Sequence, residues 1–472
     1  MSLRDAVVAV DVGTSAVRAA LVSATGAVLR SERVARTSHV GGETFDADAL
    51  LTDVEAALSR LDAVTDARVH ALGISAHIGT VAVDEDFAVV APGGGWADGR
   101  GTDVPIADDL LRDILTVAGR PVPTGGALAL GLHLQRAGAA SQVAALLSPK
   151  DFLLARLCGV TVTDTVDAAY TLASQVRTST WNTAALRRLG LPEQWWPRQA
   201  SPYEVVATLL PAAADRCGLP HGLPVVAGGP DGSVGLGLLL GASTDVIGDV
   251  AGTTDVLARL ISSVDDAPLG AVVNPAMVPG LWTAGGPTGL TGGAVADWRT
   301  LVGSVEDDVL AAVEPGVGGL VILPCMTGER FPRWRPDSRG AIIGRTSEHG
   351  AAALLRATQE GAAFTVREGL DLLDPSRDLP VVFAGGSSRA ESVVQLRADV
   401  FGRRLLVASD PDVTLLGAAA LAMIGAGVSD SLDEARATLG VSFREVEPRP
   451  GVGPRFDAAY AHWRAVRERL AG

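Results

Sequence analysis

Five residues close to the start of the sequence have the types and spacing of a phosphate-binding turn: Asp11, Gly13, Thr14, Ser15 and Arg18. Glycine lets a backbone approach phosphate oxygens closely, and the hydroxyls and amides of Thr14 and Ser15 can donate hydrogen bonds to them. The Asp11 carboxylate can hold Mg2+ through water. Arg18 would present a fixed cation to a transferred phosphoryl group. This chemistry suits the phosphates of a nucleotide.

Strands must position this turn. Residues 6–10 are apolar and β-branched, which is typical of a buried strand, and residues 17–22 resume as a second strand. A turn at residues 24–26 leads into a third strand around Val28. An ordinary hairpin with an Asp-Gly turn is the simpler alternative for this stretch taken alone.

A second copy of the pattern argues for more than a hairpin. Residues 246–256 read VIGDVAGTTDV and repeat the order of strand, aspartate, Gly-Thr-Thr and valine with one residue added. The two aspartates lie roughly 240 residues apart, about half the chain. Two like domains facing one nucleotide would explain this spacing, with Gly252, Thr253 and Thr254 as the second phosphate loop.

Composition limits the class of protein. The 472 residues suffice for two domains, and 47% hydrophobic with 20% charged residues is typical of a folded, soluble protein. A net charge of −15 argues against nucleic acid and anionic membranes as partners. Cys158, Cys217 and Cys325 lack metal-ligand spacing, so we expect reduced, buried thiols in a cytoplasmic protein. We expect no signal peptide or membrane span.

Three motifs together resemble the FGGY family of carbohydrate kinases. They are Asp-x-Gly-Thr-Ser-x-x-Arg at 11–18, Gly-Gly-x-Asp at 228–231 and Gly-Glu-Arg-x-Pro-x-Trp-x-Pro-x-x-Arg-Gly at 328–340, in the family's order. The resemblance implies an α/β fold with two ribonuclease H-like domains of the actin-like ATPase superfamily and a cleft between them. The expected domains are 1–242, with the sugar site and the catalytic base, and 243–472, which binds the nucleotide.

The resemblance also implies roles for particular residues. Asp231 matches the family's catalytic base, at a strand end that opens a helix. Phosphoryl transfer to a hydroxyl needs such a carboxylate, although a helix-capping aspartate is the simpler alternative. Gly293 would open a helix beside the nucleotide, and Gly385, Gly386 and Ser387 would form the adenine-side turn. ATP and Mg2+ are the expected cofactors.

The sugar-binding turn departs from the family pattern. Many sugar kinases of this family have Gln-Met-His where this chain has His77, Ile78 and Gly79. We expect His77 and Ile78 to line the sugar site. A turn histidine whose hydrogen bonds are satisfied within the fold is an equal alternative for His77.

A second loop is expected at the sugar site. Trp96 in a Trp-x-Asp-x-Arg loop would offer a flat apolar wall, with Asp98 and Arg100 in support. Gly232 follows the base where many pentulose kinases have a polar residue, and Asp-Gly there is similar to gluconate kinases. Gly79 and Gly232 are expected to leave space.

Other stretches are expected to be structural. Helical spacing predicts helices over 46–61, 351–373 and 456–470. Lys150 is the only lysine, and we expect it to support the domain rather than bind phosphate. Glu329, Arg330 and Arg333 are expected to organise the loop at 328–340.

The resemblance implies ATP-dependent phosphorylation of a hydroxyl on a small carbohydrate. The order of motifs resembles xylulokinase-type pentulose kinases, which favours a ketopentose such as xylulose. Alternatives are a kinase of gluconate or another sugar acid or polyol, a non-catalytic nucleotide-dependent sugar sensor, and an actin-like nucleotide switch. The expected partners are a small carbohydrate and ATP, without nucleic acid or membrane, in a protein that could form a homodimer.

Overall fold

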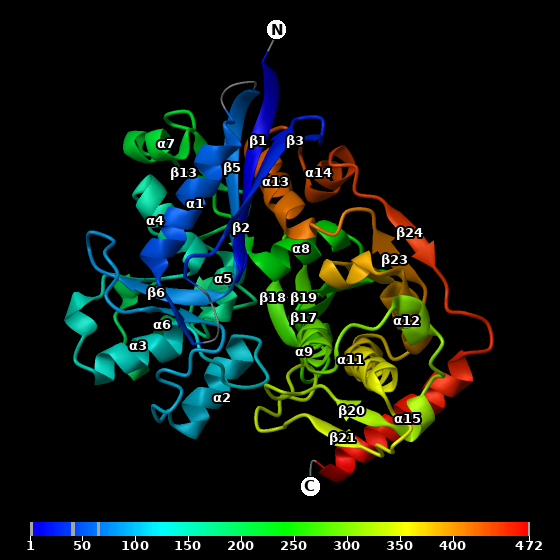
Figure 1. The fold of residues 1–472 in the computed structure, drawn as a ribbon. Helices are drawn as coiled ribbons and strands as arrows, with labels where there is room; N and C mark the ends of the chain where they lie inside the picture. Colours follow the sequence, from blue (N-terminus) through cyan, green and yellow to red (C-terminus); the bar gives the residue numbers. More distant parts are fainter. Residues whose placement is uncertain (1–2, 39–42, 64–66, 471–472) are drawn as a thin grey trace.

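The computed structural model describes residues 3–38, 43–63 and 67–470 (Figure 1). The strands of its first half are β1 (Arg4–Val12), β2 (Ala16–Ser23), β3 (Val28–Ala35), β4 (Thr44–Phe45), β5 (Ala67–Ala76), β6 (Gly79–Val83), β7 (Gly93–Gly95), β8 (Ala145–Leu147), β9 (Val162–Asp164), β10 (Ser174–Gln175), β11 (Thr180–Trp181), β12 (Arg198–Ala200), β13 (Val205–Thr208), β14 (Pro224–Val226) and β15 (Gly229–Pro230). Those of its second half are β16 (Ile247–Ala251), β17 (Thr254–Ile261), β18 (Val272–Pro275), β19 (Trp282–Leu290), β20 (Val321–Leu323), β21 (Ala341–Ile343), β22 (Val381–Ala384), β23 (Leu405–Ala408) and β24 (Phe443–Val446).

Helices cover the faces of the sheets. They are α1 (Ala47–Leu61), α2 (Asp108–Val117), α3 (Ala127–Arg136), α4 (Pro149–Cys158), α5 (Thr165–Tyr170), α6 (Thr183–Leu189), α7 (Pro211–Cys217), α8 (Asp231–Leu240), α9 (Gly292–Val302), α10 (Asp307–Ala311), α11 (Ala351–Leu373), α12 (Glu391–Phe401), α13 (Val413–Gly425), α14 (Leu432–Thr438) and α15 (Gly453–Leu470). Within the described ranges, every helix is too short or too polar to span a membrane.

Two seven-stranded sheets form the framework, so the predicted α/β class is confirmed. The first has strand order β13-β14-β5-β1-β2-β3, with β15 beside β5, and the second has order β18-β19-β17-β16-β22-β23-β24. In the first, β1 pairs antiparallel with β2 and parallel with β5. In the second, β16 pairs antiparallel with β17 and parallel with β22. The hairpin repeat predicted from the sequence is therefore present in the fold.

The predicted helices have clear local causes. Helix α1 begins after Asp46, whose carboxylate accepts hydrogen bonds from the amides of Asp48 and Ala49, each at 3.0 Å. Its buried face repeats at helical spacing and packs into the core of the first sheet. Helix α11 occupies the predicted range, whereas α15 begins at Gly453, three residues earlier than predicted.

Two helices join the halves of the chain. Helix α13 comes from the second half but packs on the first sheet, where a Cβ added at Gly73 would lie 2.3 Å from the Ala418 carbonyl oxygen. It also packs on α8, because a Cβ at Gly417 would lie 2.8 Å from the Val234 carbonyl oxygen. These small residues allow close helix packing, as predicted for Gly417. The domain division after residue 242 stays a prediction.

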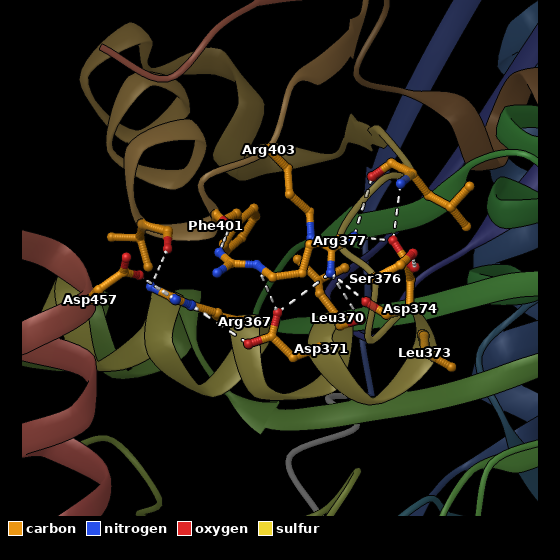
Figure 2. A network of polar contacts seen from close by, with 12 residues as sticks. Arg367, Leu370, Asp371, Leu373, Asp374, Ser376, Arg377, Phe401, Arg403 and Asp457 are labelled. Atoms are coloured by element: carbon orange, nitrogen blue, oxygen red, sulfur yellow. Dashed lines mark hydrogen bonds and ion pairs between the residues drawn. The ribbon is translucent and has the colours of Figure 1, made fainter. Parts of the chain in front are cut away.

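A polar network fixes the end of α11 (Figure 2). Buried Arg403 donates to Asp374 at 2.5 Å, just beyond the helix. About two turns earlier, Arg367 donates to the Val400 carbonyl oxygen at 2.9 Å and to Asp457 at 2.5 Å. These bonds tie α11 to the end of α12 and to α15.

Candidate active site

The ends of three adjacent strands bring the predicted catalytic residues together. Asp11 on β1 lies opposite Ser75 on β5, and Ser75 lies opposite Gly229 on β15. The next row joins residues 12, 76 and 230. Asp231 and His77 each follow that row by one position, so the predicted base and the predicted sugar-binding turn leave the same edge of the sheet.

Asp11 is a buried carboxylate with three donors. It accepts hydrogen bonds from Nε and Nη2 of Arg18, the first at 3.0 Å, and from the Ser75 hydroxyl at 3.1 Å. Burial raises the pKa of Asp11, and the charge of Arg18 opposes this rise. Carboxylate oxygens are ligands that Mg2+ prefers, so Asp11 fits the predicted metal role through water.

Arg18 lies between two carboxylates. In addition to its bonds to Asp11, its Nη1 atom donates to Asp412 at 2.6 Å. Asp412 also accepts a hydrogen bond, at 3.2 Å, from Arg389, which lies in the turn that follows β22. Arg18 is thus at the predicted phosphate site, with a carboxylate from the second half of the chain on its outer edge.

The phosphate turn of the first hairpin is open to solvent. Thr14 and Ser15 are exposed at its tip, and the amide of Gly13 donates to the Ala16 carbonyl oxygen at 3.0 Å. From behind, Arg36 donates to the Gly13 carbonyl oxygen at 3.1 Å. The hydroxyls that the sequence predicted as phosphate donors are therefore accessible.

Asp231 is the first residue of α8. It is partly exposed, and its Oδ1 atom accepts from the Gly232 amide at 2.6 Å. Desolvation raises the pKa of Asp231 to about 7, and the negative charge of Asp11 adds to the rise. A carboxylate with a pKa near neutrality can accept a proton from a hydroxyl and release it again.

His77 is buried and neutral. Its Nδ1 atom lies 3.2 Å from the Ile78 carbonyl oxygen, and its ring meets Phe45 edge-on with centroids 5.2 Å apart. Burial lowers the pKa of His77 to about 4. With Nδ1 donating to the carbonyl, Nε2 is an acceptor, and it has no partner among the residues that the structure describes. A hydroxyl donor at Nε2 would complete the ring's bonding, which supports a substrate role for His77 over the alternative of a turn histidine satisfied within the fold.

The loop with Trp96 lies next to this turn. Gly95 pairs with Gly79 across β6 and β7, and Trp96, which follows Gly95, is 45% exposed. Arg100 donates to both carboxylate oxygens of Asp98, at 2.9 and 2.7 Å, and is thus committed to supporting the loop. An exposed indole on a braced loop fits the predicted apolar wall.

The two glycines expected to leave space differ. A Cβ at Gly232 would meet nothing closer than Val256, at 3.7 Å, so this position is open. A Cβ at Gly79 would lie 2.5 Å from the Gly94 carbonyl oxygen. The expectation of space at Gly79 is wrong, because the backbone of β7, paired with β6, occupies that space. Ile78, the residue before Gly79, is half-buried.

Three turns of the second half converge as a candidate nucleotide site. The amide of Gly293, at the start of α9, donates to the Thr253 carbonyl oxygen at 3.0 Å, and a Cβ at Gly292 would lie 2.2 Å from the Gly252 carbonyl oxygen. The same Cβ would lie 3.5 Å from the Ser387 hydroxyl.

Two glycines shape the turn after β22. Gly385 has a φ of 97° and packs against Ala251, the last residue of β16. A Cβ at Gly386 would meet nothing within 4 Å. This open backbone next to a helix N-terminus leaves room for a nucleotide. Thr254 is the first residue of β17 and ends the stretch predicted as the second phosphate loop.

The second hairpin differs from the first in its electrostatics. Its buried Asp249 pairs with Arg397 at 2.9 Å, and Asp255 pairs with the same guanidinium. Burial, together with the charge of Asp255, raises the pKa of Asp249 well above its usual range. Asp249 is therefore used inside the domain, unlike Asp11 at the first hairpin.

Lys150 holds a buried acidic cluster together, as its predicted supporting role requires. Its ammonium contacts Asp151 and lies 3.2 Å from Asp164 and 3.6 Å from Asp167. A Cβ at Gly228 would lie 2.8 Å from the Lys150 Cδ atom. The three carboxylates are close enough to bind a metal ion, but the lysine already neutralises part of their charge. The cluster lies directly behind the strand that leads to the predicted base.

Sequence reasoning missed several residues of the site. Ser75 lies in a strand that was predicted, but its role depends on strand register. Arg36 and Asp412 had no local signal, because neither belongs to a recognisable motif. Arg330 was expected to organise its own loop, and its guanidinium instead lies 4.1 Å from the ring centroid of Trp96.

Family comparisons cover most of the chain. The model for the N-terminal domain of the FGGY family of carbohydrate kinases matches residues 6–237, and the model for the C-terminal domain of that family matches residues 250–426. Together these matches include the first hairpin, the predicted base, the Gly-Thr-Thr turn of the second hairpin and the predicted adenine-side turn.

Individual relatives carry different names, xylulose kinase and gluconokinase among them. The chain is 28% identical over 453 residues to a xylulose kinase of Bacillus subtilis (strain 168), covering 91% of this chain and 90% of that protein. It is 25% identical over 467 residues to a gluconokinase of the same organism, covering 92% and 90%. The structure of ligand-bound xylulose kinase from Lactobacillus acidophilus superimposes with a TM-score of 0.89, at 22% identity and 99% coverage of both chains. This likeness confirms the predicted two-domain, actin-like fold.

Proposed function

Because the chain belongs to the FGGY family of carbohydrate kinases, and is a phosphotransferase that uses ATP, we propose that its acceptor is a ketopentose such as xylulose. The observation that carries the proposal is the placement of Asp231. Asp231 lies at the same edge of the first sheet as Asp11 and His77, and the pKa of its carboxylate is raised to about 7. A base of this strength beside a phosphate-binding turn suits proton removal from a sugar hydroxyl.

The proposed roles follow from the contacts. Asp231 accepts the proton of the attacking hydroxyl, and the start of α8 fixes its carboxylate through the Gly232 amide. Arg18 stabilises charge on the transferred phosphoryl group. Mg2+ bound through Asp11 would neutralise phosphate charge.

We propose that residues 1–242 hold the sugar and the base, and residues 243–472 the nucleotide. Gly252, Thr253, Gly293 and the turn at 385–387 converge on one side, which supports the second part of this division. The first part is supported by the shared strand edge of Asp231 and His77.

The turn at 77–79 suits a hydroxyl of a neutral sugar, although a cation from the second half of the chain, Arg330, lies 4.1 Å from the ring centroid of nearby Trp96 and keeps a sugar acid open as the second candidate. His77 is neutral at pH 7, because its pKa is about 4, and both edges of the Asp98 carboxylate already engage Arg100. His77 offers an acceptor, which suits a sugar hydroxyl instead.

Gluconate is the second candidate substrate. Space beside the base at Gly232 and the similarity to a gluconokinase support it. A third candidate, a sugar sensor without turnover, requires the base and phosphate residues to be unused.

The test is ATP-dependent turnover on D-xylulose, D-ribulose, L-xylulose, glycerol, erythritol and D-gluconate, with the wild type and His77→Ala. We expect turnover on a ketopentose and a higher KM in the variant, since a hydroxyl partner is lost. Activity confined to gluconate and lost in His77→Ala would contradict the ketopentose proposal. Absence of turnover on all six, with ATP still bound, would favour the sensor.

A further inference from the structure

Arg330 behaves differently from the charged residues around it. Glu329 accepts from Ser338 at 3.1 Å and lies 3.4 Å from Arg467, so it braces its own loop. Arg333 donates to Glu368 at 3.0 and 2.6 Å and serves the same purpose. Among the described residues, Arg330 makes neither a hydrogen bond nor an ion pair through its side chain.

The Arg330 backbone is nevertheless well fixed. Its carbonyl oxygen accepts from the Trp334 amide at 2.8 Å, and the amide of the next residue, Phe331, donates to the Pro287 carbonyl oxygen at 3.0 Å. Pro287 belongs to β19, the strand that leads into α9 at the candidate nucleotide site. A fixed backbone with an unpaired guanidinium is an arrangement suited to reaching another surface.

That surface is the ring of Trp96. The guanidinium carbon lies 4.1 Å from the ring centroid, within cation–π range. In Figure 1 the yellow-green loop between β20 and β21 extends toward the part of the chain that precedes α2, which contains Trp96. The contact therefore joins the nucleotide-side half of the molecule to the loop beside the sugar-binding turn.

The position of Trp96 gives the contact a consequence for the sugar site. Its neighbour Gly95 is paired with Gly79, so the indole belongs to the wall next to His77. Because the ring remains 45% exposed, packing within its own loop does not fully fix it. An arginine stacked on the ring restricts its orientation, and burial near the ring lowers the pKa of Arg330 without removing its charge.

We propose that Arg330 is a positioning residue that reaches from the second half of the chain to Trp96 and orders the indole as a wall of the sugar site. The expected effect of Arg330 on the KM for the sugar rests on the proposed sugar site. The contact itself is tested independently of any substrate.

The first experiment is a double-mutant cycle on stability. Arg330→Met, Trp96→Leu and the double variant are compared by equilibrium unfolding in urea. If the two side chains interact, either single substitution already removes the contact. The increase in the unfolding equilibrium constant of the double variant should then be about 3- to 30-fold smaller than the product of the two single-variant increases. Arg339→Met is the matched control, since exposed Arg339 bonds only to carbonyl oxygens of its own loop, and it should combine additively with Trp96→Leu. Additivity of Arg330→Met with Trp96→Leu would overturn the proposal.

The second experiment separates sugar binding from nucleotide binding. Arg330→Met should raise the KM for the sugar about 3- to 30-fold and leave the dissociation constant for ATP within twofold, whereas Arg330→Lys should recover part of the loss. Equal weakening of ATP binding would overturn the proposal. So would a loss seen with gluconate alone, because it would make Arg330 a direct partner of the substrate carboxylate. If the proposed function fails and no sugar is phosphorylated, the stability cycle still decides whether Arg330 and Trp96 are coupled.

Discussion

The Nη1 atom of Arg18 lies 2.6 Å from a carboxylate oxygen of Asp412, a residue 394 positions further along the chain. Asp412 precedes α13 and also pairs with Arg389 in the turn after β22. It thus connects the first hairpin, predicted to bind phosphate, with the turn predicted to lie beside adenine. Under the proposed role of Arg18, Asp412 and a phosphate would compete for one guanidinium.

Asp412→Asn should tighten ATP binding. The substitution frees an edge of Arg18 and removes a negative charge beside the phosphate site, so we expect the dissociation constant for ATP to fall by about 2- to 10-fold at low ionic strength. Isothermal titration calorimetry measures it. Asp378→Asn makes the same charge change at an exposed residue and should have no effect. Weaker ATP binding by Asp412→Asn would show that Asp412 helps the site instead.

Activity should fall on the acid side of neutrality. Asp231 must be ionised to accept a proton, and its pKa is about 7, so kcat/KM should decrease tenfold per pH unit below that value and level off above it. Because the charge of Asp11 contributes to the raised pKa of Asp231, the residual activity of Asp11→Asn should show an acid limb at lower pH. A flat profile between pH 5.5 and 8 would contradict both statements.

Lys150→Met should destabilise the protein strongly. The substitution leaves the buried carboxylates of Asp151, Asp164 and Asp167 without their cation, which typically costs about 3–5 kcal/mol of unfolding free energy. The control is Arg188→Met, since Arg188 forms an exposed pair with Asp109 and a solvent-exposed ion pair contributes little to stability. Similar losses of unfolding free energy in the two variants, measured in urea, would show that Lys150 does not stabilise the cluster more than an exposed ion pair stabilises the surface.

The network of Figure 2 should be acid-sensitive. Although burial opposes the change, hydrogen bonds from Ser376, the Leu379 amide and Arg403 lower the pKa of Asp374 to about 2. A depressed pKa means that the stabilisation is present above pH ~4 and is lost as the pH falls through about 2. Asp374→Asn should therefore destabilise at pH 6 and progressively less toward pH 2.5. A loss independent of pH would contradict this origin.

Much of the fold could be predicted because its signals are local. The first hairpin and its later copy follow from apolar strands interrupted by Asp and Gly, and α11 follows from helical periodicity. The adjacency of Asp231 to His77 could be inferred only through the family resemblance, because it depends on the register of β15 against β5.

Other features could not be predicted, because they depend on contacts across the chain. Asp412 reaches Arg18 only when α13 has packed on the first sheet. The sequence suggested space at Gly79, but a carbonyl oxygen from β7 fills it. Arg330 lies in a recognised motif, yet its partner Trp96 is in the other half of the molecule.

The most direct test of the account is the turnover of Asp231→Asn. Asparagine keeps the size of the side chain and cannot accept the proton, so kcat should fall by on the order of 100-fold or more while ATP and the sugar still bind. The variant should be at least as stable as the wild type at pH 8, because ionised Asp231 is held in a desolvating site. Turnover within a few fold of the wild type would contradict the assignment of Asp231 as the base.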